Sequence, residues 1–195
     1  MTFLNAFITL FLVMDAVGNV PVFLALLKHI EVKRRKVIIF RESLIAYGIL
    51  SLFLFGGHSI LKLFAISTEA LGISGGLILF LIALKMIFPP DEVVTRNQSL
   101  HEPFIVPLAI PFIAGPSTMA VLILMADQYP KHLIQWWGAL SLSALLTMVI
   151  LLFSSKLLKL MGQKLLAALE RLMGMILATL AVQMLLVGIK HYFQL

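Results

Sequence analysis

The chain contains six apolar stretches, each long enough to cross a lipid bilayer as a helix. A hydrocarbon core of about 30 Å needs roughly 20 helical residues. A membrane barrel strand would alternate apolar and polar residues over about 10 positions, whereas these stretches are apolar on every face. We therefore expect an all-α membrane protein with six transmembrane helices. The segments are 3–27, 43–61, 70–88, 103–126, 133–155 and 172–189.

Composition excludes a soluble globular domain and several kinds of site. Apolar residues make up 61% of the chain and charged residues 12%, where soluble domains have about a quarter charged. The absence of cysteine excludes disulfides and thiolate metal sites. We expect no metal site, no bound cofactor and no enzymatic activity, because no second acid inside a predicted segment accompanies Asp15 and no His-Glu-x-x-His pair occurs.

The basic residues predict the orientation in the membrane. All except Lys62, Lys131 and Lys190 lie in the connections between segments one and two, three and four, and five and six. Under the positive-inside rule we expect these three connections to be cytoplasmic and both termini to lie outside. The net charge of +6 is thereby explained by topology, and we expect no nucleic-acid partner.

Two segments carry helix breakers where an uninterrupted helix is expected. The first holds DAVGNVP at 15–21, and the fourth holds PLAIPFIAGPST at 107–118. Unwound backbone at membrane depth is tolerated only where protein buries it or where it lines a wet cavity. We therefore expect helices 1 and 4 to be discontinuous at the midplane, with second halves that begin at Pro21 and Pro116. Asn19, Ser117 and Thr118 would satisfy the freed amides.

An internal repeat relates the two halves. Residues 76–86 (GLILFLIALKM) match residues 174–184 (GMILATLAVQM) at five of eleven positions with an offset of 98, and Gly18 and Gly115 stand 97 apart within the two breaks. Three segments per half is an odd number, so the halves have opposite orientations. We expect a single transmembrane domain over 1–195, with inverted three-helix repeats at 1–90 and 103–195 and a cytoplasmic linker at 91–102.

The two breaks predict a binding site for a small zwitterion. Opposed half-helices bring two positive helix N-termini to one central region, which suits a carboxylate, and Asp15 suits an ammonium group. The alternative is that Asp15 caps its own interrupted helix while the glycines allow close packing. The candidate substrate-binding residues are Asp15, Gly18, Asn19, Pro21, Ser74, Gly75, Gly76, Gly115, Pro116, Ser117 and Thr118.

Three stretches together carry a family resemblance. MDAVGNVPVF, ISGGLILFLIALKMIF and EPFIVPLAIPFIAGPST, in this order, resemble the MarC family of integral inner-membrane proteins over nearly the whole chain. The resemblance implies six helices in two inverted repeats. It also implies transport of small neutral amino acids of the size of glycine and alanine, with proton coupling.

Proton coupling requires a carboxyl group that gains and loses a proton, and Asp15 is the candidate. Sodium is the rival coupling ion, with carbonyls of the unwound backbone and the hydroxyls of Ser117 or Thr118 as ligands. A channel or exporter for another small solute and an accessory subunit of a membrane complex are the alternative functions. Arg41 and Glu42 are expected to reach the headgroups, and Gln183 faces either the pathway or a neighbouring helix.

Overall fold

The computed structural model describes residues 2–27, 30–88, 104–160 and 163–193, and every named element in these ranges is helical. The all-α prediction is thus confirmed, and the predicted linker at 91–102 lies outside the described residues. The elements are α1 (Phe3–Met14), α2 (Ala16–Leu26), α3 (Val32–Leu63), α4 (Thr68–Ile87), η1 (Leu108–Ile113), α6 (Pro116–Gln128), η2 (Pro130–His132), α7 (Leu133–Leu160) and α8 (Gln163–Tyr192).

Within the described residues, five helical stretches are long and apolar enough to cross a membrane. They are Phe3–Leu26, which combines α1 and α2, and Val32–Leu63, Thr68–Ile87, Pro130–Ser154 and Arg171–Lys190. The predicted fourth segment is not among them. Its described part contains the short π-helix η1 and then the 13-residue α6, because proline prevents a continuous helix there.

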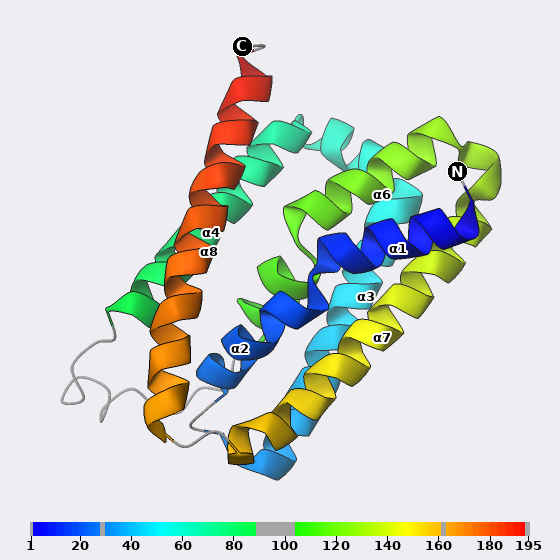
Figure 1. Ribbon diagram of the computed structural model, residues 1–195. Helices are drawn as coiled ribbons and strands as arrows, with labels where there is room; N and C mark the ends of the chain where they lie inside the picture. The colour runs from blue at the N-terminus through cyan, green and yellow to red at the C-terminus, as the bar shows by residue number, and fades with distance from the viewer. Residues whose placement is uncertain (1, 28–29, 89–103, 161–162, 194–195) are drawn as a thin grey trace.

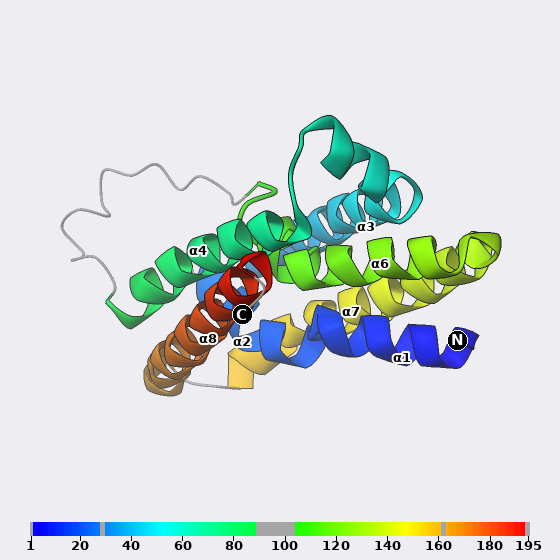
Figure 2. The same ribbon diagram turned by 90° about the horizontal axis from the view of Figure 1, so that it is seen from above.

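The helices form two groups that lie beside each other (Figures 1 and 2). One group is the pair α4 and α8, which pack closely along each other. In the other group, α3 and α7 pack together, while α7 also contacts α1 and α2 and α3 also contacts α6. Trp136, Phe23, Leu50 and Leu122 are buried in this second group. Helices α2 and α6, one from each interrupted segment, contact both the α3–α7 core and the α4–α8 pair.

Glycines bring α4 and α8 into close approach. A β-carbon added to Gly76 would lie 3.1 Å from the carbonyl oxygen of Ala181, and one added to Gly174 would lie 3.2 Å from that of Ala83. The same two added carbons would come within 3.2 Å of Met184 Cβ and 3.0 Å of Met86 Cβ. Small residues let membrane helices gain van der Waals contact that a larger side chain would prevent.

We expect Gly174→Ala to lower the free energy of unfolding by about 1–3 kcal/mol, because its methyl group meets α4 backbone that cannot easily move. Gly48→Ala is the matched control, since a β-carbon on Gly48 meets nothing within 4 Å. Both changes gain the same helix propensity, so their difference reports the steric contact. Thermal unfolding in detergent measures it. Equal midpoints of thermal unfolding would show that α4 and α8 move apart to accommodate the added methyl group without loss of stability.

Candidate functional site

The first interruption is a single residue, Asp15, between α1 and α2. Its backbone is left-handed, with φ 43° and ψ 55°, a conformation that is uncommon for residues other than glycine. Its carboxylate Oδ1 accepts a hydrogen bond of 3.1 Å from the Gly18 amide and so caps α2. A β-carbon on Gly18 would overlap this carboxylate, which explains the glycine. The helical path is therefore broken at an acid that serves as the cap, and the two helices together form one candidate membrane span.

The prediction that the second half-helix begins at Pro21 is wrong. Helix α2 begins at Ala16, and Pro21 lies inside it. The physical reason is the Asp15 side chain, which satisfies an amide of the first turn and so starts the helix earlier. Pro21 is half-buried and does not line the cavities described below.

Asn19 joins the two interruptions. It is 7% exposed, and its Nδ2 donates to the carbonyl oxygens of Met14 and Phe112, at 3.0 Å in each case. Met14 is the last residue of α1, and Phe112 belongs to η1, 93 positions from Asn19. The expected role of Asn19 toward freed amides is thus wrong, because its amide group instead serves two carbonyls that the interruptions release.

The second interruption ends at Gly115 and Pro116. Pro116 occupies the first turn of α6, as predicted, and Gly115 is the N-cap residue, so no side chain caps this helix. A β-carbon on Gly115 would lie 3.1 Å from the Pro111 carbonyl oxygen. Ser117 is exposed, whereas Thr118 is 1% exposed and its hydroxyl has no hydrogen-bond partner. Helix α6 therefore lacks a side-chain cap at its N-terminus, whereas α2 has one.

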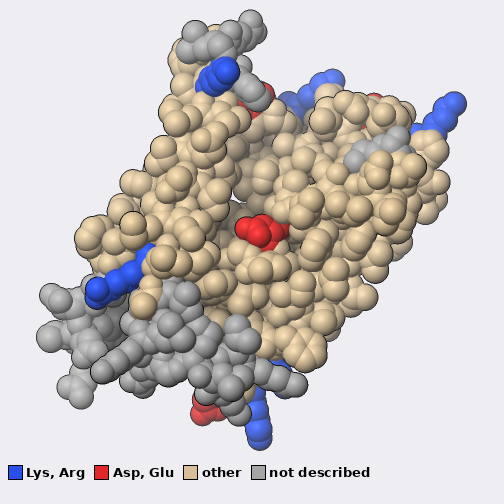
Figure 3. Space-filling model, in the orientation of Figure 1, with Lys and Arg blue, Asp and Glu red and all other residues tan. Residues whose placement is uncertain are grey.

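A cavity of about 310 Å³ lies where the two interruptions meet. From the first segment it takes Asp15, Gly18 and Asn19, and from the second it takes Gly115, Pro116 and Ser117. Helix α8 supplies one wall. Asp15 is exposed here, and Figure 3 shows one acidic spot beside a hollow in the middle of a face that is otherwise largely uncharged between its two ends. The remaining lining residues are Val13, Met14, Leu79, Pro111, Phe112, Met173, Ile176, Leu177, Leu180, Gln183 and Met184.

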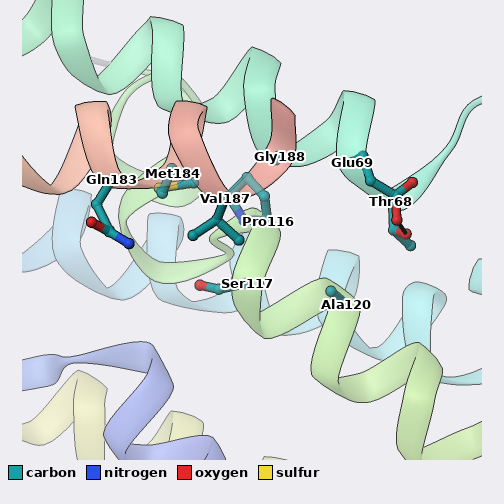
Figure 4. A pocket seen from close by; sticks show the side chains of 10 residues that line it. Thr68, Glu69, Pro116, Ser117, Ala120, Gln183, Met184, Val187 and Gly188 are labelled. Atoms are coloured by element: carbon teal, nitrogen blue, oxygen red, sulfur yellow. Dashed lines mark hydrogen bonds between the residues drawn. The ribbon is translucent and has the colours of Figure 1, made fainter. Parts of the chain in front are cut away.

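A second cavity, of about 290 Å³, adjoins the first through four shared residues. Those are Pro116, Ser117, Gln183 and Met184. Figure 4 looks into this second cavity, which extends past Val187 and Gly188 of α8 and Ala120 of α6 to Thr68 and Glu69 at the start of α4. The two cavities thus share part of their walls, and the second one extends that hollow toward the start of α4. Gln183, for which the sequence left open the pathway or a neighbouring helix, lines both cavities.

Five predicted site residues do not line the central cavity: Pro21, Ser74, Gly75, Gly76 and Thr118. Ser74 is exposed, and its hydroxyl donates to the Leu71 carbonyl oxygen at 3.0 Å. Gly75 and Gly76 are buried at helix contacts, and a β-carbon on Gly75 would overlap the Pro116 ring. These two glycines set how closely α4 approaches α6 and α8.

The ion pair of Arg41 and Glu42, which the sequence predicted to lie at the headgroups, contacts the start of the second interruption. Glu42 is fully buried, with Oε1 2.8 Å from Arg41 Nη2 and Oε2 accepting the Ile105 amide at 2.8 Å. The Arg41 guanidinium also lies 4.9 Å from the centre of the Phe104 ring. Ile105 has φ 61°, a strained value for a β-branched residue. The expectation of headgroup exposure is wrong for Glu42, because this carboxylate supplies an acceptor to unwound backbone.

No group of three His, Asp or Glu side chains is placed to hold a metal ion in the part of the chain that the structure describes.

The chain matches the family model described as MarC family integral membrane protein over residues 1–193. It belongs to the MarC family. No solved structure matches it.

Relatives of this MarC protein cover nearly its whole length. A UPF0056 membrane protein of Buchnera aphidicola is 50% identical over 187 residues, which is 96% of this chain and 95% of the relative. The UPF0056 inner membrane protein YhgN of Escherichia coli is 48% identical and covers 98% of both chains. A UPF0056 membrane protein of Chlamydia pneumoniae is 35% identical over 98% of this chain and 96% of its own.

In this MarC protein, Asn19→Ala is expected to lower the free energy of unfolding by about 2 kcal/mol, because two buried carbonyls lose their donor. Asn5→Ala is the control, since Asn5 is an exposed asparagine of the same membrane segment. Chemical denaturation in detergent compares them. Equal stability of the two variants would show that the Met14 and Phe112 carbonyls do not depend on Asn19.

Glu42→Ala is expected to destabilise the MarC fold by about 2–4 kcal/mol, since it leaves the Ile105 amide unpaired and removes the carboxylate from beside the Arg41 guanidinium. The control is Glu31→Ala, at an exposed glutamate that makes no side-chain cap to the same helix. Limited proteolysis near Phe104 gives a local readout. Unchanged cleavage there in the Glu42 variant would contradict a role in holding this segment.

Proposed function

We propose that this MarC protein is a secondary transporter that moves a small neutral amino acid, of the size of glycine or alanine, across the bacterial inner membrane. The observation that carries the proposal is the central cavity, which two interrupted membrane segments from opposite halves of the chain build around Asp15. Placing an acidic side chain at membrane depth costs free energy, and such residues usually mark substrate or ion pathways. The proposed activity is transport rather than catalysis, with no cofactor beyond the coupling ion.

The two halves are proposed to be inverted repeats. In the packing, α2 contacts α7 and α8, and α6 contacts α3 and α4. These contacts exchange when α2 is paired with α6, α3 with α7, and α4 with α8. The glycine contacts behave in the same way, because Gly76 meets Ala181 and Gly174 meets Ala83, and each pair is related by the 98-residue offset. This symmetry supports six crossings, which bring both termini to one side of the membrane, and the distribution of basic residues favours the outside. Substrate sites commonly lie at such repeat interfaces.

The proposed substrate is a zwitterion because the cavity offers both signs of charge. Asp15 presents a carboxylate, while the first turn of α6 presents amide groups at the positive end of a helix dipole. The groups that Gly18 and Gly115 contribute to the lining are small, which leaves room for a short side chain. A dication or dianion would leave one of these charges unmatched.

Proton coupling is proposed to use Asp15, whose carboxylate faces the cavity while it caps α2. Protonation would remove the charge that attracts the substrate's ammonium group, so ion and substrate occupancy become linked. Sodium is the rival ion, with the hydroxyls of Ser117 and Thr118 among its ligands. A channel would conduct without saturation, and an accessory subunit would show no transport alone.

The test is uptake of labelled alanine and glycine into proteoliposomes under a pH gradient or a sodium gradient. We expect saturable uptake that is driven by a pH gradient with the acidic side inside the vesicles, because protonation of Asp15 and binding of the ammonium group exclude each other. Asp15→Asn should abolish accumulation while the protein still inserts and folds, because asparagine caps a helix as well as aspartate does but does not titrate. Asp127→Asn, at an exposed aspartate that does not line this cavity, is the control.

Each outcome separates the candidates. Accumulation by the Asp15→Asn variant equal to that of the native protein would exclude Asp15 as the coupling group. Uptake that follows only the sodium gradient would favour the rival ion. No saturable uptake of either amino acid by correctly inserted protein would overturn the proposed substrate class.

A further inference from the structure

A groove of about 310 Å³ lies between α3 and α7 and shares no residue with either cavity of the candidate site. Its walls are mostly apolar, and two of its residues, Leu44 and Leu145, are 59% and 53% exposed. Because α3 and α7 both supply candidate membrane spans, these exposed leucines face the bilayer. The lining residues are Ser43, Leu44, Tyr47, Ser141, Ala144, Leu145 and Met148.

Polar links between the two helices bound the groove near the middle of the membrane. The Tyr47 and Ser141 hydroxyl oxygens are 2.8 Å apart, and both residues lie close to the middle of their membrane spans. One turn further along each helix, Trp137 Nε1 donates to Ser51 Oγ at 3.3 Å. The other lining residues precede Tyr47 in α3 and follow Ser141 in the antiparallel α7. The groove therefore runs from the middle of the membrane toward one surface.

Two lysines lie on the same face of α3, on the side toward which the groove runs. Lys33, Lys36, Phe40, Ser43 and Tyr47 follow one another at spacings of three, four, three and four residues, so they form one stripe. The first three of them are exposed. Lys36 precedes Tyr47 by 11 residues, which is about 16 Å along a helix, and half of a hydrocarbon core is about 15 Å. With Tyr47 at mid-membrane, Lys36 is thus at the level of the headgroups.

This stripe has the dimensions and the order of groups of one lipid leaflet. The positive charges stand at headgroup depth, and the apolar groove occupies the depth of the acyl chains. An acyl chain is as apolar as the leucines of the groove, and basic residues beside membrane helices attract anionic headgroups. A second copy of the chain fits this face less well, because a two-fold axis along the membrane normal would bring the lysines of both copies together at one depth.

We propose that this groove binds a phospholipid with an anionic headgroup, whose phosphate contacts Lys33 and Lys36 and whose acyl chain passes Phe40 into the space between α3 and α7. The lipid belongs to the leaflet on the basic side of the protein. The site is separate from the central cavity, so the inference goes beyond the proposed function and does not depend on the transported solute.

The first experiment measures, by native mass spectrometry in detergent, the binding of phosphatidylglycerol and of the zwitterionic phosphatidylcholine. The native protein should prefer phosphatidylglycerol. The double variant Lys33→Gln and Lys36→Gln should weaken that binding about 30-fold, because each lysine near a membrane surface contributes about 5-fold. The matched control is Lys85→Gln with Arg171→Gln, which removes two exposed positive charges from α4 and α8. This control should bind phosphatidylglycerol as the native protein does.

The second experiment tests the groove with both lysines in place. Ala144→Phe should fill the groove and abolish the preference for phosphatidylglycerol. Ala178→Phe is the control, at a half-buried alanine of α8 that lines neither this groove nor the two cavities. Thermal unfolding without added lipid checks that both variants are folded. Glycerol 3-phosphate, which carries a phosphate but no acyl chain, should not displace the lipid, so a free phosphate is distinguished from a lipid headgroup.

Three results would overturn the inference. One is equal binding of phosphatidylglycerol and phosphatidylcholine by the native protein. Another is equal affinity for phosphatidylglycerol in the Lys33→Gln, Lys36→Gln variant and in its charge-matched control. The third is a native dimer that Ala144→Phe converts to a monomer, which would assign the groove to a second copy of the chain. None of these measurements involves amino acid uptake, so the proposed function stands or fails separately.

Discussion

Every backbone polar group in the hydrocarbon region needs a partner from the protein itself, and the two interruptions of this chain create groups that their own helices cannot satisfy. The Asn19 amide meets that requirement for both, through the Met14 and Phe112 carbonyls. One side chain thus fixes the distance between two segments from opposite halves of the chain. The cavity that Asp15 lines lies beside this link, because Asn19 and Phe112 both belong to its wall.

The two interruptions are alike in placement and unlike in chemistry. Asp15 caps α2 from within the chain, whereas Gly115 leaves α6 without a cap. This difference turns a pair of similar helix starts into a site with a negative and a positive end. A symmetric pair, with acids or glycines at both places, would hold like charges and would not distinguish the two ends of a zwitterion.

Local signals in the sequence predicted the all-α fold, five of the six apolar segments and Pro116 at the first turn of α6. Long apolar runs and proline residues act on neighbouring residues, so their effects can be predicted from the sequence alone. The prediction failed at Pro21 because an acid side chain six residues earlier is the stronger helix start. The alternative that Asp15 caps its own helix proved to be part of the structure, and the acid lines the cavity as well.

The roles of Asn19 and Glu42 could not be predicted, because their partners lie 93 and 63 positions away. A buried glutamate beside an arginine has the same local pattern as a pair at the headgroups, and only the fold reveals the Ile105 amide. Likewise, the glycines at 75 and 76 are small residues that suit either a site or a helix contact. The structure assigns them to contacts with α6 and α8.

The short α6 has a consequence for how the protein is made. Its 13 residues extend about 20 Å, less than the hydrocarbon thickness, and the preceding backbone is irregular. The partners that satisfy this irregular backbone, Asn19 and Glu42, belong to the half that the ribosome synthesises first. The second interrupted segment thus takes two of the partners of its irregular backbone from residues that are already synthesised when it emerges.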